Sequence, residues 1–281
     1  MDLPKSRAVA PRLEFLDTAT STNDLLREAA TGADAAGWTH GSVLVTDDQT
    51  RGRGRLGRTW LAPTGKTLAI SVLLRPGGAG VPVLPVDAYG WIPLIAGAAM
   101  TEAVTRAVEA AVPAEPDDPD DLSGGVEVRL KWPNDVLVSG FKVCGILSEL
   151  LPESGAVIVG AGLNLTLDEH DLPTLTSTSL LLATGVQPDA DAVLADYLAT
   201  FGRLFDAFTA HGGDPDASGI AEAVSALCGT LGSEVRVELP GDHELIGTAE
   251  RIDADGRLVV RDRENGEEQA VAAGDVTHLR Y

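Results

Sequence analysis

Short apolar runs and alternating apolar and polar positions recur through the first 160 residues of the chain. Such runs are typical of β-strands, and they occur at residues 12–17, 42–46, 67–75, 126–132, 135–138, 142–151 and 156–160. Two helical patterns interrupt them. Ser21-Thr22-Asn23-Asp24 places capping side chains directly before the apolar residues of a first helix, and an alanine-rich stretch at 91–112 predicts a longer one. The pattern predicts an α+β fold, with a sheet and helices between its strands in the sequence.

The pattern changes after Gly162. Helical periodicity returns at 191–210 and 217–227. Four short alternating strands follow, expected at 235–239, 244–252, 258–261 and 268–271 and separated by turns at Pro240-Gly241, Asp255-Gly256 and Asn265-Gly266. About fifty residues of this kind suffice for a small domain. The sequence therefore predicts two domains, residues 1–229 and residues 230–281, and the second is a small β-barrel.

The chain is strongly acidic. Its 281 residues include 21 Lys and Arg against 42 Asp and Glu, a formal net charge of −21. Nonspecific binding of nucleic acid depends mostly on cations that release counterions from phosphates, so this balance argues against a general DNA-binding protein. Acidic residues, Pro and Gly concentrate at 113–125, a composition typical of a solvated loop. We assign that loop no function.

The sequence shows no targeting signal and no cysteine pattern typical of disulfides or of a metal site. No apolar run reaches the roughly 18 residues that a membrane span needs, and residues 1–15 lack the apolar core of a signal peptide. We therefore expect a cytoplasmic protein that does not cross a membrane. Cys144 and Cys228 lie far apart without a metal-ligand spacing, which predicts two buried thiols.

Basic charge is concentrated at residues 51–58. The segment RGRGRLGR holds four of the 21 basic residues, where even spreading would give roughly 0.6. Arginine binds phosphate or carboxylate through a planar fork, and interleaved glycine lets the backbone approach a ligand closely. The segment therefore predicts a flexible loop that orders on a polyanion. The alternative is a solvated basic loop.

Two familiar phosphate-binding motifs fail in this region. Gly52, Gly54 and Gly57 spell GxGxxG, but no helical pattern follows and no acidic residue lies about 20 positions further on. Gly65-Lys66-Thr67 resembles the end of a Walker A loop, but Trp60 stands where that motif requires glycine. Neither a Rossmann fold nor a P-loop is expected.

Two further clusters carry candidate chemistry. In the segment 131–135, KWPND, Pro133 cannot continue a central strand, which places the following Asn and Asp at a turn. With Lys142 this turn suits ATP, because lysine binds phosphate and a carboxylate holds Mg²⁺; a plain β-turn is the alternative. The segment 160–164, GAGLN, is expected at a strand end, where small residues admit a ligand or a closely packed strand equally well.

Together these segments resemble biotin protein ligases. The resemblance rests on STN at 21–23, Gln49 before GRGRLGR at 52–58, KWPNDV at 131–136, Lys142 with GILSE at 145–149, and GAGLN at 160–164. It runs from about Arg12 to the C-terminus, and GRGRLGR followed by KWPND is highly specific. It implies a catalytic domain with a mixed β-sheet flanked by helices, like that of class II aminoacyl-tRNA synthetases. A small SH3-like β-barrel should follow.

The resemblance also implies an activity. Biotin and MgATP give biotinyl-5′-AMP and pyrophosphate, and a lysine of a biotin carboxyl carrier domain of an acyl-CoA carboxylase then takes the biotinyl group. It implies biotin contacts from Ser21, Thr22, Asn23, Gln49, Arg53, Gly54, Arg55, Lys142, Gly145, Gly160 and Gly162. It implies contacts to ATP or the adenylate from Arg55, Arg58, Trp60, Lys131, Asn134 and Asn164.

The same resemblance implies catalytic roles for Arg53, Arg55 and Lys142. Asp135 is the candidate ligand of Mg²⁺. Either Trp60 or Trp132 could stack on adenine, and either could instead be core. The chain has no GxSxG elbow and no Cys/His signature, so we expect no protein nucleophile.

Two alternatives remain open. A lipoate–protein ligase shares the fold and the chemistry, but GRGRLGR and KWPND favour biotin. A non-catalytic biotin sensor would not need cations for phosphate, so the basic residues at 53, 55, 131 and 142 argue against it. No helix-turn-helix fits before Arg12, so we expect no DNA-binding or repressor role. We expect a monomer or a weak homodimer.

Overall fold

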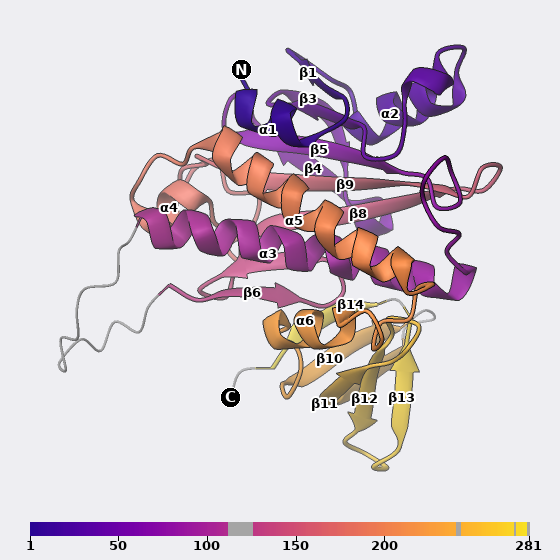
Figure 1. Cartoon of the computed structure of the whole chain (residues 1–281). Coiled ribbons are helices and arrows are strands. Elements are labelled where there is room, and N and C mark those ends of the chain that lie inside the picture. Colours follow the sequence, from indigo (N-terminus) through magenta and orange to yellow (C-terminus); the bar gives the residue numbers. More distant parts are fainter. Residues whose placement is uncertain (112–125, 240–242, 273, 280–281) are drawn as a thin grey trace.

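The computed structural model describes residues 1–111, 126–239, 243–272 and 274–279. The acidic segment at 113–125 and the turn at Pro240-Gly241 lie outside this set. The part of the chain that the structure describes contains a seven-stranded main sheet, a five-stranded C-terminal sheet and a two-stranded sheet. The C-terminal sheet lies below the main sheet in Figure 1. Among the residues described, no helix is long and apolar enough to cross a membrane.

The main sheet has seven strands in the order β1-β2-β5-β9-β8-β7-β6. β1 and β2 are parallel and every other neighbouring pair is antiparallel, so the sheet is mixed, as expected. The strands are β1 (Leu13–Leu16), β2 (Val43–Thr46), β5 (Thr67–Leu74), β6 (Val128–Lys131), β7 (Asp135–Val138), β8 (Phe141–Leu151) and β9 (Ala156–Asn164). The segment 160–164 therefore forms the C-terminal end of β9, as expected, although this strand continues to Asn164 and not only to residue 160 as predicted.

The described residues include six α-helices, which cover or flank this sheet. They are α1 (Pro4–Val9), α2 (Thr22–Thr31), α3 (Ile92–Ala111), α4 (Leu180–Thr184), α5 (Ala190–Ala210) and α6 (Ile220–Leu227). Figure 1 shows α3 and α5 packed side by side across one face. Ser21 caps α2 by accepting a hydrogen bond from the Asp24 N–H, which confirms the predicted helix start. The short α1 and α4 carry too few periodic residues to stand out in the sequence.

Alternation along the strands gives the main sheet two different faces. Val157 and Val159 of β9 join the large core under α3 and α5, whereas Ile158 belongs to a second core cluster with residues of α2. The next positions of β9 on the α2 face are Gly160 and Gly162. Because α2 fills only part of this face, these glycines are left to line a cavity.

A β-hairpin occupies the place of the expected flexible basic loop. β3 (Gln49–Arg53) and β4 (Thr59–Ala62) are antiparallel and joined by a short 3₁₀ turn at Arg55–Gly57. Leu56 and Gly57 adopt positive φ at its tip. The prediction of a loop at 51–58 is wrong because arginine and glycine hide the alternation by which a strand is recognised.

The second sheet is antiparallel, with the order β13-β12-β11-β10-β14. Its strands are β10 (Glu234–Leu239), β11 (His243–Ile252), β12 (Leu258–Asp262), β13 (Glu268–Val271) and β14 (Asp275–His278). The four strands predicted for this region are confirmed, and β14 is an additional one. The expected all-β module at the C-terminal end is therefore present, with β13 and β14 at its edges. The exact division at residues 229 and 230 stays a prediction.

Hydrogen bonds of two buried tryptophans join the C-terminal part of the chain to the rest of the molecule. The Trp91 indole donates to the Ala254 carbonyl at 2.8 Å, and the Trp132 indole donates to the Gly256 carbonyl at 3.1 Å. Thr230 is fully buried, and its Oγ1 accepts a hydrogen bond from the Trp132 backbone N–H at 3.0 Å. Trp132 is thus a core residue at the junction of the two sheets.

Thr230→Val should destabilise the protein, because it leaves the buried Trp132 N–H without an acceptor while preserving side-chain shape. We expect the free energy of unfolding to fall by about 1–3 kcal/mol, measured by denaturant titration. Thr230→Ser keeps the acceptor oxygen and should remain much closer to the wild type. Equal losses in the two variants would contradict this account.

Candidate functional site

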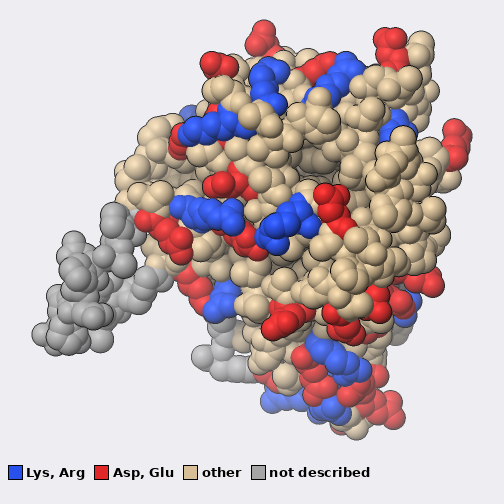
Figure 2. Space-filling view, viewed as in Figure 1, with Lys and Arg blue, Asp and Glu red and all other residues tan. Residues whose placement is uncertain are grey.

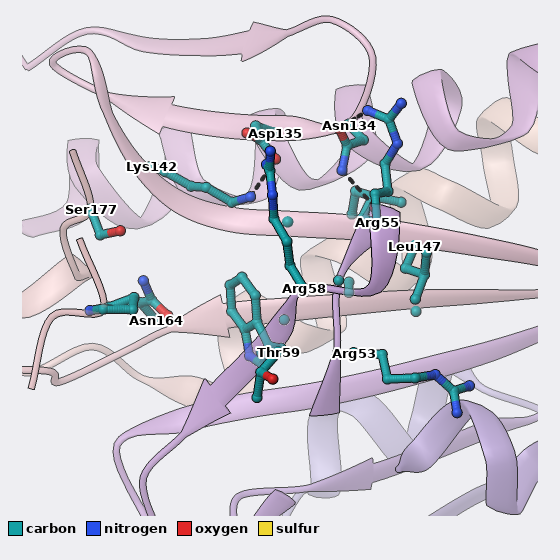
Figure 3. A pocket seen from close by; sticks show the side chains of 18 of the residues that line it. Arg53, Arg55, Arg58, Thr59, Asn134, Asp135, Lys142, Leu147, Asn164 and Ser177 are labelled. Atoms are coloured by element: carbon teal, nitrogen blue, oxygen red, sulfur yellow. Dashed lines mark hydrogen bonds and ion pairs between the residues drawn. The ribbon is translucent and has the colours of Figure 1, made fainter. Parts of the chain in front are cut away.

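One cavity of about 360 Å³ lies on the α2 face of the main sheet, between the hairpin and strands β8 and β9. Every residue predicted to bind a ligand or metal, or to act in catalysis, contributes to its lining. These residues are Ser21, Thr22, Asn23, Gln49, Arg53, Gly54, Arg55, Arg58, Trp60, Lys131, Asn134, Asp135, Lys142, Gly145, Gly160, Gly162 and Asn164. Segments separated by more than 140 residues in the sequence therefore meet at one place, and Figure 3 shows part of this lining.

Neutral polar groups form the end of the cavity next to α2. The Gln49 Oε1 accepts hydrogen bonds from the backbone N–H and the hydroxyl of Thr22, at 2.8 and 3.2 Å. This use of Oε1 leaves the Gln49 amide NH₂ to donate elsewhere. The Ser21 hydroxyl oxygen accepts from the Asp24 N–H and keeps its own proton for donation.

Asn23 is buried at the same end and has three polar neighbours. Its Nδ2 donates to Glu149 Oε2 at 2.7 Å and lies 3.3 Å from the Leu147 carbonyl. Its Oδ1 accepts from the Ser71 hydroxyl at 2.6 Å. The amide lies against Gly160, where a Cβ would approach Oδ1 to 2.5 Å. The absence of a side chain at Gly160 therefore makes room for Asn23.

Two other glycines make room for an indole. Gly145 of β8 and Gly162 of β9 are directly paired across the two strands. A Cβ on Gly162 would collide with the Trp60 ring, and one on Gly145 would lie 3.2 Å from it. The Trp60 N–H is buried and has no hydrogen-bond partner among the described residues. Of the two candidate tryptophans, Trp60 therefore lines the cavity, whereas Trp132 belongs to the core.

Charged groups form the opposite end. Lys142 Nζ lies 2.5 Å from Asp135 Oδ1 and 5.7 Å from the centre of the Trp60 ring. The Lys142 main chain is anchored on both sides, because its N–H donates to the Thr176 carbonyl and its carbonyl accepts from the Thr178 N–H, both at 2.8 Å. This anchoring aims a half-buried ammonium group at the cavity with little freedom of the backbone.

The hairpin contributes two arginines to this end. Arg55 donates to the Asn134 side-chain oxygen at 2.9 Å and to the Gly274 carbonyl at 3.2 Å. Burial lowers the pKa of Arg55, although a guanidinium remains charged at any pH at which proteins fold. Arg58 pairs with Asp275 of β14, and this ion pair lowers the pKa of Asp275. The C-terminal sheet therefore borders the cavity.

Arg53 has a different orientation from the other two. Figure 3 shows its side chain directed away from Lys142 and Asp135. Its guanidinium pairs with both carboxylate oxygens of Asp24, at 2.6 and 2.7 Å, and with Glu149 at 3.2 Å. Arg53 thus borders the cavity while its charge is held by α2 and β8.

A resident metal cage is not formed at this site. No group of three or more His, Cys, Asp or Glu side chains suited to a metal ion occurs among the described residues. Mg²⁺ is nevertheless commonly bound by one or two carboxylates together with the phosphates of a substrate. Asp135 fits that arrangement, because it lies beside the cations that would meet a phosphate. Cys144 and Cys228 are buried free thiols, as predicted.

Several lining residues carry no motif that could have revealed them. Pro173, Thr174, Thr176 and Ser177 come from the irregular segment before α4, and Asp275, Val276 and Thr277 come from β14. They reach the cavity through tertiary packing. Glu149 lies in the GILSE segment, but the sequence alone does not indicate its contact with Asn23, because this contact depends on how α2 packs against β8.

Comparison with known proteins gives two family matches. Residues 16–164 match the Biotin/lipoate A/B protein ligase family, and residues 230–279 match the Biotin protein ligase C terminal domain. The biotin–[acetyl-CoA-carboxylase] ligase of Mycobacterium tuberculosis is 37% identical over 271 residues, which cover 96% of this chain and 90% of that protein. The likeness therefore spans both sheets.

Solved structures show the same likeness. The biotin protein ligase of Aquifex aeolicus in complex with biotin and ATP has a TM-score of 0.71 and 26% identity, covering 96% of this chain and 100% of that one. The biotin protein ligase of Leishmania major in complex with biotinyl-5-AMP has a TM-score of 0.58 and 26% identity, covering 94% and 99%.

The ion pairs of Asp24 predict how stability depends on pH. Hydrogen bonding to Arg53, assisted by Arg27, lowers the pKa of Asp24 below its ordinary value. A lowered pKa adds stability above the ordinary value, and this stability is lost as the pH falls through the lowered one. Asp24→Asn should therefore be less stable than the wild type at pH 7, and the gap should close below about pH 4. Denaturant titrations across this range test it; a gap that stays constant would contradict it.

Proposed function

Because this chain belongs to the Biotin/lipoate A/B protein ligase family, we propose that it activates biotin with ATP and transfers the biotinyl group to a lysine of a carrier domain of an acyl-CoA carboxylase. Relatives and structural neighbours that match over nearly the whole chain are named for biotin. Neither a lipoate ligase nor a non-catalytic sensor gains support from them. The cytoplasmic location and the monomeric or weakly dimeric state stay predictions.

One observation carries the proposal: a single cavity combines a neutral polar end with a cationic end. Biotin has a matching distribution of charge, because a neutral cyclic urea lies at one end of the molecule and a negatively charged carboxylate lies at the other. The urea needs an acceptor for its N–H groups and donors for its carbonyl. Asn23 Oδ1 is an acceptor at the neutral end, and the Ser21 hydroxyl and the Gln49 NH₂ are donors.

The first chemical step joins two anions. A carboxylate oxygen of biotin attacks the α-phosphorus of ATP, and the bond to the β-phosphate breaks to release pyrophosphate. Two unit charges 4 Å apart repel by about 4 kcal/mol at an effective dielectric constant near 20. Lys142, Arg55 and Arg58 surround the end of the cavity where these charges would meet. We assign them the stabilisation of the charge that develops as the phosphorus is attacked.

Asp135 is the carboxylate that would hold Mg²⁺ with the nucleotide, and a bound Mg²⁺ would offset phosphate charge there. Lys131 and Asn134 flank the turn before Asp135 and suit phosphate and adenylate contacts. Asn164 is held by its donation to the Thr178 carbonyl at 2.8 Å. Trp60 offers an aromatic face in the cavity, suited to stacking against the bound ligand.

The second step needs access for a protein lysine and exclusion of water. The lysine amine attacks the carbonyl of the mixed anhydride, AMP leaves with the bonding electrons, and the nitrogen loses a proton as the amide forms. A mixed anhydride is prone to hydrolysis, so a covering element lowers this loss. The hairpin β3–β4 forms a wall of the cavity, and we assign it this shielding role.

Biotin-dependent exchange of pyrophosphate into ATP tests the proposed function on the purified full chain. Exchange should require biotin and should be absent with lipoate or with no acid. A supplied carrier domain should then react with streptavidin on a blot. Binding of biotin without exchange would favour the sensor, and exchange with lipoate would favour the related ligase.

Lys142→Ala should lower the rate of biotin-dependent exchange by about 10²- to 10³-fold, the effect of removing one group that stabilises developing charge. Circular dichroism should show an unchanged fold. Lys5→Ala is the matched control, because Lys5 is an exposed lysine of α1 that pairs with Asp189, and neither residue lines the cavity. A Lys142→Ala variant with the exchange rate of the control would remove Lys142 from the mechanism.

A further inference from the structure

The carboxylate of Glu149 sits behind the neutral end of the cavity without being one of its lining residues. Its two oxygens have separate partners. Oε1 pairs with Arg27 at 2.9 Å and with Arg53 at 3.2 Å, whereas Oε2 accepts from Asn23 Nδ2 at 2.7 Å. Glu149 therefore connects Asn23 with the arginine of the hairpin and the arginine of α2.

An asparagine amide can offer a ligand either a donor or an acceptor, depending on how it is turned. A carboxylate only accepts hydrogen bonds, so the Asn23 atom that faces Glu149 must be the NH₂ group. The Ser71 hydroxyl donates on the other side at 2.6 Å, to Oδ1. These contacts hold Asn23 in one of its two orientations, with the oxygen on the side of Ser71 and Gly160.

We propose that Glu149 is a positioning residue that fixes Asn23 as a hydrogen-bond acceptor for a ring N–H of biotin, and so sets the preference of the cavity for a cyclic urea. This inference rests on the proposed function. With Asn23 reversed, its NH₂ group would face the N–H of the urea, and two donors would oppose each other. A dithiolane ring has no N–H and gains nothing from the acceptor.

Glu149→Gln tests the proposal, because glutamine is nearly isosteric and can turn its own NH₂ toward Asn23. The ligands are biotin and its two cyclic carbamate analogues, in each of which one ring N–H is replaced by oxygen. Dissociation constants are measured by calorimetry on the full chain. In the wild type, one analogue should bind about 10- to 100-fold more weakly than biotin, the usual cost of a lost hydrogen bond with an unpaired polar group.

In Glu149→Gln, biotin should lose about 10- to 100-fold in affinity, while that analogue should change little, so the discrimination between them collapses. The KM for biotin should rise, whereas kcat at saturating biotin should stay within about three-fold, because the group acts on binding. A ratio of two affinities in one variant does not depend on the folded fraction.

Asp24→Asn is the matched control. The Asp24 carboxylate pairs with the same two arginines, Arg27 and Arg53, but the described residues show no hydrogen bond between it and the Asn23 side chain. It should keep the wild-type discrimination between biotin and the analogue. An equal loss of affinity for both ligands in Glu149→Gln, or an unchanged ratio, would overturn the positioning role. A wild-type chain that does not bind biotin would instead overturn the proposed function.

Discussion

The site depends on one constraint, which is the close approach of side chains to strand backbone at Gly145, Gly160 and Gly162. The Asn23 amide lies against Gly160, and the Trp60 ring lies against the paired Gly145 and Gly162. A methyl group on Gly160 or Gly162 would occupy space that these side chains already fill. The floor of the cavity therefore lacks side chains at these three positions of β8 and β9, whereas residues on the other face of the same strands pack into the large core.

The same strands thus serve the core and the site by alternation. Cys144 and Ile146 of β8, like Val159 and Ala161 of β9, face the large core. The positions between them face α2 and the cavity. The strand register extends this separation of core-facing and cavity-facing positions to the neighbouring strands, because Gly145 pairs with both Asp135 of β7 and Gly162 of β9. A slip of one residue would turn the glycines into the core and the apolar side chains into the cavity.

Much of this arrangement could be predicted from the sequence. The features that could not be predicted either lack a local pattern or depend on contacts between distant elements. Apolar runs identify the strands of the main sheet and all strands of the second sheet except β14, and the motif segments line one cavity. The hairpin has no recognisable alternation because arginine and glycine at residues 51–53 occupy most of β3. Glu149 and Asp275 carry no local signal because their contacts with Asn23 and Arg58 are tertiary. Local sequence patterns indicate the secondary structure that a residue favours. These contacts depend instead on the register and packing of elements that are distant in the sequence.

Ion pairs on both sides of the hairpin hold it in place. Four arginines in eight residues would repel one another, yet the chain carries a formal charge of −21 and supplies carboxylates nearby. Figure 2 shows the same interspersion on the face it presents, where Lys and Arg lie beside Asp and Glu. Arg53 is held by Asp24 of α2, and Arg58 by Asp275 of β14. Because β14 belongs to the C-terminal sheet, both parts of the chain hold the hairpin in place. An anion that bound to Arg58 would have to compete with Asp275. The C-terminal sheet is therefore part of the site and helps to set its charge.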